Sequence, residues 1–158
     1  MITDVSTRDV STLRIDSRGL LDSLAKAMNE HPAEYGLLGW CDLDLGLVVH
    51  RPDDDGFRAR ICLRGYGCEA VADFPSGTEG DVDCWLEGDL APWQSMLDDI
   101  VANGRATGLQ TLSSQVLLGD KIHLRSADAM GADRFFRYNQ TLQSFFDAAA
   151  AIGRPVAS

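Results

Sequence analysis

Histidine, cysteine and acidic side chains are the groups in this sequence that could bind a metal ion, so their spacing is considered first. His31, His50 and His123 are isolated from one another, and none has the spacing of a metal-ligand pair. The four cysteines are scattered and form no C-x-x-C pair: Cys41, Cys62, Cys68 and Cys84. We therefore expect no metal site, and we expect the cysteines to be reduced thiols, with Cys41 and Cys84 as small buried apolar residues.

Two acidic groups raise the possibility of a calcium site. One comprises Asp42, Asp44 and Gly46, and the other is the run Asp53–Asp55. Neither fits the twelve-residue calcium loop that ends in a glutamate. A solvated strand face and the tip of a hairpin explain both groups, although weak binding of a cation by Asp53–Asp55 remains open.

The segment 65–70, Gly-Tyr-Gly-Cys-Glu-Ala, has the spacing of a dinucleotide-binding glycine turn. That turn requires a buried strand before it and a helix after it. Here the preceding strand carries alternating arginines and the following residues look like another strand. We therefore interpret the segment as a turn between antiparallel strands, and we expect no cofactor.

A stripe of apolar side chains lies on the last predicted helix, Asp133–Ile152, and is rich in phenylalanine. Its members share one broad face: Phe135, Phe136, Leu142, Phe145, Phe146, Ala149 and Ile152. Such a stripe normally faces a core. Alternatively, its rings roof an apolar cavity for a ligand, with Trp40, Trp85 and Trp93 adding to the lining. Periodicity alone does not distinguish a filled core from a hollow one.

Segments in which apolar and polar residues alternate predict the β-strands of the domain. Trp40–His50 and Phe57–Arg64 alternate apolar with charged residues around the turn 51–56, which predicts a hairpin with aspartates opposite arginines. Further strands are expected at Cys68–Phe74 and Asp81–Glu87. Because short turns join these strands, we expect an antiparallel meander.

Helical periodicity predicts two earlier helices. Asp16 or Ser17 caps the first, whose stripe is Leu20, Leu21, Leu24 and Met28, and Pro32 stops it. Asp89 caps the second, which has Pro92 in its first turn and ends at Asn103-Gly104. Its apolar face consists of Trp93, Met96, Leu97, Ile100 and Val101. Residues Leu109–Leu118 and Lys121–Leu124 are predicted as strands, and another short strand is possible at Thr12–Ile15.

Composition limits the class of protein. The 158 residues carry 14 basic and 24 acidic side chains, so the formal charge is −10, which makes nucleic acid and anionic membranes unlikely partners. We see neither a signal peptide nor an apolar run of membrane-spanning length, and we expect a soluble, cytoplasmic protein. The predicted organisation is an arm at 1–16, one domain at 17–153 and a tail at 154–158.

From about Leu20 onward, the order of elements resembles the SCP2 sterol-carrier domain family. The local likeness is clearest in residues 81–97, where an acid-containing strand precedes a helix that opens with a bulky residue. Val116–Asp120 looks like the late strand of that family, and Phe135–Ala149 resembles its closing helix. The resemblance covers some 130 residues, by element order more than by identity.

This resemblance implies an α+β fold with a mainly antiparallel five-stranded sheet covered by helices around an apolar tunnel. It also implies non-catalytic binding of a sterol, a fatty acid or an acyl chain. Mapped onto this sequence, the lining comes from the middle and last helices: Trp93, Met96, Leu97, Ile100, Phe135, Phe136, Leu142, Phe145 and Phe146. The acidic charge argues against coenzyme A as part of the ligand.

Two other hypotheses remain open. The first is a small cofactor-free enzyme with a cone-shaped fold similar to that of the ketosteroid isomerase group. In that case Asp83, Asp120 or His123 would act as a base inside an apolar cavity. The second is an interaction module with a filled core, which uses a sheet edge or the surroundings of Trp93 for a protein partner or a homodimer.

Overall fold

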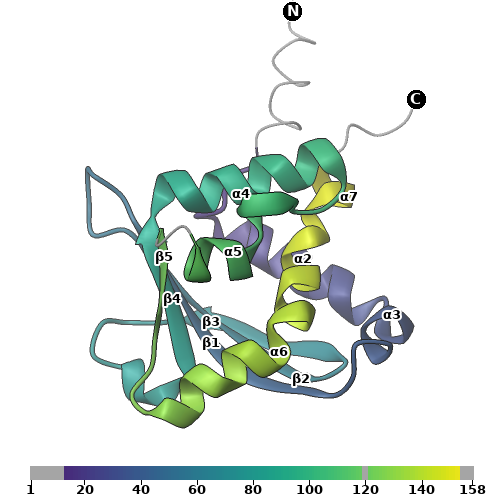
Figure 1. Ribbon diagram of the computed structural model, residues 1–158, viewed down its shortest axis with the longest axis horizontal. Helices are drawn as coiled ribbons and strands as arrows, with labels where there is room; N and C mark the ends of the chain where they lie inside the picture. The colour runs from purple at the N-terminus through teal and green to yellow at the C-terminus, as the bar shows by residue number, and fades with distance from the viewer. Residues whose placement is uncertain (1–12, 119–120, 154–158) are drawn as a thin grey trace, which may run out of the picture.

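The computed structural model describes residues 13–118 and 121–153, which form a five-stranded sheet with helices packed on one face (Figure 1). The strands are β1 (Cys41–His50), β2 (Phe57–Gly65), β3 (Gly67–Asp73), β4 (Cys84–Asp89) and β5 (Ile122–Arg125). The helices are α2 (Arg18–Asn29), α3 (Pro32–Gly36), α4 (Leu90–Asn103), α5 (Leu112–Leu117), α6 (Ala129–Asp147) and α7 (Ala149–Gly153). Two 3₁₀ turns complete the order, η1 (Glu79–Asp81) and η2 (Gly108–Gln110). The predicted α+β class and five-stranded sheet are confirmed.

The first helix begins and ends as the sequence predicts. The Ser17 hydroxyl accepts a hydrogen bond from the Leu20 amide (3.2 Å), and the four stripe residues are buried. Pro32 lies beyond the end of α2 and opens the short helix α3, which the sequence did not predict. Thr12 lies outside the described residues, and residues 13–15 form no strand. Ile15 is fully buried, and the Gln94 side chain bonds to the Ile15 amide (3.1 Å) and the Leu13 carbonyl (2.7 Å), so the end of the predicted arm packs on α4.

The predicted hairpin of β1 and β2 is confirmed. The strands pair antiparallel, and Asp42 lies opposite Arg64. The Arg64 guanidinium contacts the Asp44 carboxylate (2.9 Å), and Arg60 lies 3.5 Å from the same group. These ion pairs line the outer face of the sheet, where charges help to fix register.

The predicted meander is wrong at its fourth strand. The sheet order is β3-β2-β1-β4-β5, so β4 pairs with β1 rather than β3, and it does so in parallel. The connection from β3 crosses the outer face, where Phe74 and Val82 pack with Val48. Gly46 permits this crossing, because a Cβ atom at position 46 would overlap the Phe74 ring.

The segment between α4 and β5 differs most from its prediction. Helix α4 runs as expected from its N-cap Asp89 to Gly104, which has the left-handed φ of 88°. Residues 109–118, predicted as strand, instead form η2 and α5. The Thr111 side chain caps α5, and Leu112 and Gln115 share its buried face at helical spacing. The final predicted strand is confirmed as β5, which pairs antiparallel with β4.

The last predicted helix is confirmed, although it begins earlier and is interrupted. Helix α6 begins at Ala129, because the Asp128 carboxylate caps it by accepting the Gly131 amide proton (2.9 Å). It ends at Asp147, and after Ala148 the short helix α7 continues to Gly153. Pro155, predicted to end the helix, lies outside the described residues.

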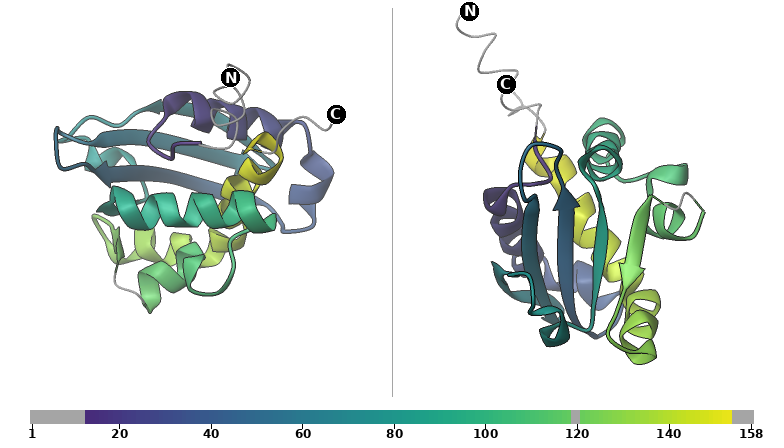
Figure 2. Two further views of the ribbon diagram at one scale, coloured as in Figure 1. Left: turned by 90° about the horizontal axis from the view of Figure 1, so that it is seen from above. Right: turned by 90° about the vertical axis from the view of Figure 1, so that its left-hand side faces the viewer.

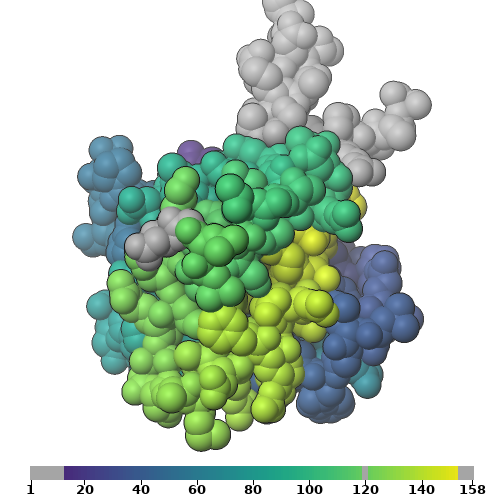
Figure 3. All heavy atoms as spheres, viewed as in Figure 1, coloured from purple at the N-terminus to yellow at the C-terminus, as the bar shows by residue number. Residues whose placement is uncertain are grey.

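Helices α2, α4 and α6 share one apolar core with the inner face of the sheet. The layered arrangement is visible in the two rotated views of Figure 2. Figure 3 shows α4, α5 and α6 side by side on the helical face of the molecule. Within the described ranges, no helix is long and apolar enough to cross a membrane. The layers thus place the two aromatic helices, α4 and α6, against each other over the sheet.

Candidate functional site

The nine residues predicted to line a ligand site come from α4 and α6. Eight are buried with at most 1% exposure: Trp93, Met96, Leu97, Ile100, Phe135, Leu142, Phe145 and Phe146. Phe136 differs, because 42% of it is exposed and its ring packs at a steep angle against Phe135 (5.2 Å between centroids). Folding therefore gathers eight of the nine in one place and leaves Phe136 at its edge.

Direct contacts join the two helical faces. The Trp93 ring lies 6.2 Å from the Phe146 ring, which in turn packs edge-on against Phe145 (5.3 Å). The Trp93 indole donates a hydrogen bond to the Val48 carbonyl (3.3 Å), which satisfies its one polar group inside the core. Gln143 places its amide 3.9 Å from the Met96 sulfur at the border of this face. The site is thus a hydrocarbon and aromatic layer between the helices and β1.

The other two tryptophans do not belong to this layer, contrary to the interpretation that all three line one cavity. Trp85 packs with the small cluster on the outer face of the sheet, and its indole donates to Glu87 (3.2 Å). Trp40 precedes β1 and is 68% exposed. Spacing along a strand gives alternation between faces, but it does not say which face is covered by helices.

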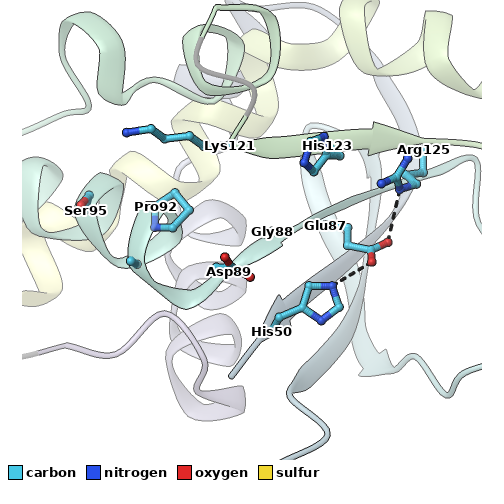
Figure 4. Close-up of a pocket in the computed structure, with 10 residues that line it drawn as sticks. His50, Glu87, Gly88, Asp89, Pro92, Ser95, Lys121, His123 and Arg125 are labelled. Carbon is cyan, nitrogen blue, oxygen red and sulfur yellow. Dashed lines mark hydrogen bonds and ion pairs between the residues drawn. The ribbon is translucent and has the colours of Figure 1, made fainter. Parts of the chain in front are cut away.

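A polar pocket of about 590 Å³ opens where the parallel strands β1 and β4 end (Figure 4). Its walls come from these strands, β5 and the first turns of α4: His50, Glu87, Gly88, Asp89, Ala91, Pro92, Ser95, Lys121, His123 and Arg125. This pocket was not predicted from the sequence. It depends on the parallel pairing of β1 with β4, and strand periodicity carries no signal for that pairing.

Glu87 is at the centre of the charges in this pocket. Its carboxylate lies 2.8 Å from the His50 imidazole and 3.5 Å from Arg125, and it accepts the Trp85 indole proton. Burial alone would raise the pKa of Glu87, but the hydrogen bonds from His50 and Trp85 outweigh it and hold that pKa below its usual range. Glu87 is therefore an ionised structural partner at neutral pH, which makes it a poor general base.

A second open pocket of about 680 Å³ adjoins the first and shares His50, Asp89 and Ala91 with it. Arg14 and Arg51 line it together with Leu90, which also packs against the main core. Both arginines contact the buried carboxylate of Asp16, at 2.9 and 3.0 Å. Burial opposes ionisation of Asp16, yet these hydrogen bonds lower its pKa. Because Arg51 also contacts Asp54 (2.9 Å), the two arginine charges face two carboxylates.

Of the three candidate bases of the enzyme hypothesis, the two that the structure describes, Asp83 and His123, lie in polar surroundings. The Asp83 carboxylate accepts the Asp44 amide proton (2.8 Å) and lies 3.8 Å from Arg134. His123 lines the polar pocket and pairs with Glu87 near the end of β4, whereas Asp83 precedes the start of that strand. Asp120 lies outside the described residues. No specific arrangement among the described residues favours proton abstraction.

The cysteine and glycine motifs have structural roles. All four cysteines are buried and free, and burial raises the pKa of Cys41 and of Cys84 to about 12. Neither of those two thiols is an ionised nucleophile at neutral pH. Within the described ranges, no group of three or more His, Cys, Asp or Glu side chains could hold a metal. Gly65, with a φ of 67°, lies at the turn between antiparallel β2 and β3, as predicted.

Comparison with solved structures identifies the fold. A conserved hypothetical protein of Thermus thermophilus, described as possibly a sterol carrier protein, superposes with a TM-score of 0.65 at 20% identity, covering 94% of this chain and 96% of the other. A crystal structure of sterol carrier protein 2 gives a TM-score of 0.60 at 20% identity, with coverage of 87% and 98%. No protein-family model and no curated protein matches the sequence. The chain therefore has an SCP2-like fold.

Proposed function

We propose that this SCP2-like chain is a non-catalytic carrier that binds an apolar, lipid-like molecule between the sheet and α6. The observation behind the proposal is the pair of facing apolar surfaces on α4 and α6, in a fold shared with sterol carrier protein 2. The eight buried residues of α4 and α6 form the binding layer. Phe136 lies at its edge.

The chemistry of this layer suits a hydrocarbon ligand. Its surface is aliphatic and aromatic, and the indole of Trp93 is already bonded to the Val48 carbonyl. Burial of each ligand CH₂ group contributes roughly 0.8 kcal/mol, so a chain of ten or more groups offers enough free energy without charged contacts. Because Trp93 and Phe146 contact each other, binding requires these rings to separate around the ligand.

Displacement of a fluorescent fatty acid from the purified protein tests the proposal. We expect a dissociation constant of tens of micromolar or lower, which corresponds to about −6 kcal/mol or better. The variant Phe146→Leu should weaken or strengthen binding by at least threefold, because it changes the shape of the layer. An absence of binding by the parent protein at these concentrations would refute the proposal.

Phe74→Leu is the matched control for this experiment. Phe74 is 2% exposed, but it packs on the outer face of the sheet, away from α4 and α6. Both substitutions remove a buried ring and should lower the melting temperature by similar amounts. If the two variants change fatty-acid affinity equally, the effect reflects general destabilisation, and the layer between α4 and α6 is not the binding site.

A further inference from the structure

A patch of four large apolar side chains is exposed at the end of the sheet where β1 begins, beside α3. Leu37 and Trp40 are the most exposed members, at 89% and 68%, and Leu38 and Tyr66 are each about two-fifths exposed. Trp40 and Tyr66 pack edge-on with 5.8 Å between their centroids. We call these four residues the α3 patch. Because β1 starts opposite the end of β2, the patch joins the α3–β1 connection to the β2–β3 turn (Figure 1).

The patch is built into the fold rather than carried on a loose loop. The Trp40 ring lies against Gly65, where an added Cβ would be 3.4 Å from the ring. Gly39, with a φ of 99°, has the left-handed conformation that favours glycine, between the two leucines and the tryptophan. Because the backbone beneath Trp40 already holds its ring in place, binding through this ring loses little side-chain conformational entropy.

The α3 patch adjoins a pocket between α3 and the end of α6. Leu38 lines a pocket of about 230 Å³ with Tyr35, Ser144, Asp147 and Ala148. The Tyr35 hydroxyl donates a hydrogen bond to the Ser144 carbonyl (3.1 Å), so α3 is fastened to α6 one residue before Phe145. The pocket therefore lies at the junction of α3 with the end of α6, the helix that also carries Phe145 and Phe146.

We infer that the α3 patch docks the protein on an uncharged lipid surface, such as a zwitterionic bilayer interface, where the ligand is exchanged. The inference rests on the proposed carrier function and adds a partner to it. Tryptophan and tyrosine, with an apolar body and a polar tip, favour the interface between hydrocarbon and water. Leu37 and Leu38 supply the side chains that enter the acyl region.

The size of the patch favours a lipid surface over a protein. Even an aromatic side chain buries only about 150–250 Å², and Leu38 and Tyr66 are already more than half covered. The remainder falls short of the roughly 800 Å² that each partner contributes to a standard protein interface. A bilayer interface needs no matching surface, since a few inserted side chains suffice for reversible attachment.

The negative charge of the protein determines which class of lipid surface the α3 patch can approach. The protein has a net charge of −10, and two acids, Glu34 and Asp147, line the pocket beside the patch. An anionic leaflet would repel this region, whereas zwitterionic headgroups carry no net charge. The expected partner is therefore a neutral phospholipid surface.

Flotation with phosphatidylcholine vesicles tests the inference. We expect the parent protein to float with the vesicles, with a blue shift of its tryptophan emission and protection from iodide that a variant without Trp40 does not show. The double variant Leu37→Ser/Trp40→Ser should lose at least tenfold in vesicle affinity. Leu109→Ser/Leu117→Ser is the matched control, because these leucines are 70% and 63% exposed but lie on η2 and α5.

Three outcomes would overturn the inference: unchanged flotation of the patch variant, equal loss in the control variant, and a dimer in light scattering that only the patch variant dissociates. A separate titration with fluorescent fatty acid in vesicle-free buffer keeps the two proposals distinguishable. Here the patch variant should bind like the parent, while its rate of uptake from vesicles falls. If the parent binds vesicles but no fatty acid, the carrier function fails and the docking surface stands.

Discussion

At the scale of single residues, two carboxylates have pKa values that move in opposite directions. Glu87 is held ionised by His50 and Trp85, so its pKa is lowered in the folded state. Asp147 accepts hydrogen bonds from the Ala106 amide (3.1 Å) and the Gln143 side chain (3.0 Å), yet burial dominates and raises its pKa. The difference has consequences for stability, because a shifted pKa makes the free energy of unfolding depend on pH.

The variant Glu87→Gln tests the first of these effects. Because the folded pKa is lowered, the carboxylate stabilises the protein above the ordinary value near 4.3, and this stabilisation disappears as the pH falls through the folded pKa. We expect the variant to lose about 1 kcal/mol at pH 7, with the loss shrinking below pH 4. Urea denaturation across this pH range measures the difference. The exposed Glu69→Gln is the control, and an equal loss in both would contradict the role of the His50 contact.

The variant Asp147→Asn should have the opposite effect. Because the folded pKa is raised, stability falls as the pH rises from the ordinary value of an aspartate toward the folded pKa, and the full loss is present above the folded pKa. Below the ordinary range both folded and unfolded states are neutral. Asparagine retains an oxygen that can accept the Ala106 and Gln143 hydrogen bonds. We expect the variant to be more stable at pH 7 by on the order of 1 kcal/mol and equal to the parent near pH 3. Thermal melts at the two pH values would show no such convergence if the hydrogen bonds, rather than the charge, decide the effect.

At the scale of elements, local sequence patterns predict that a strand or helix exists better than they predict which strands pair with each other. The β1–β2 hairpin was predictable because period-two alternation and a turn-rich link act over neighbouring residues. The parallel pairing of β4 with β1 was not, since it depends on Phe74 crossing over Gly46 outside the sheet. The mistaken strand at 109–118 has a similar cause. Its apolar residues alternate weakly, while the Thr111 cap and the Leu112–Gln115 spacing carry the helical signal.

The same distinction applies to the candidate site. Helical periodicity correctly identified the residues that α4 and α6 bury together, with Phe136 left at the edge. It could not place Trp40 and Trp85, because alternation does not reveal which side of a strand the helices cover. The polar pocket around Glu87 and the α3 patch both arise where distant segments meet, so neither has a signature within a single segment.

Docking of α6 on the strand layer gives a testable prediction for an element. A Cβ at Gly131, in the first turn of α6, would overlap the Asp83 carbonyl, a backbone group that cannot rotate away. We expect Gly131→Ala to destabilise the protein by about 1–3 kcal/mol, although alanine favours helix. Gly19→Ala is the matched control in the first turn of α2, where the new Cβ would contact only the Ser17 hydroxyl at 3.6 Å. Denaturation midpoints should therefore fall for the first variant and hold or rise for the second.

At the scale of the whole molecule, the net charge of −10 should control the choice of membrane surface. Charge repulsion extends over a Debye length of about 30 Å at 0.01 M salt but only about 3 Å at 1 M. At low salt we therefore expect several-fold weaker flotation with vesicles that contain anionic lipid than with pure phosphatidylcholine. In 1 M salt the two affinities should converge, because apolar insertion of Leu37 and Trp40 is not screened. Tighter binding to anionic vesicles at low salt would show that a basic surface, rather than the α3 patch, makes the contact.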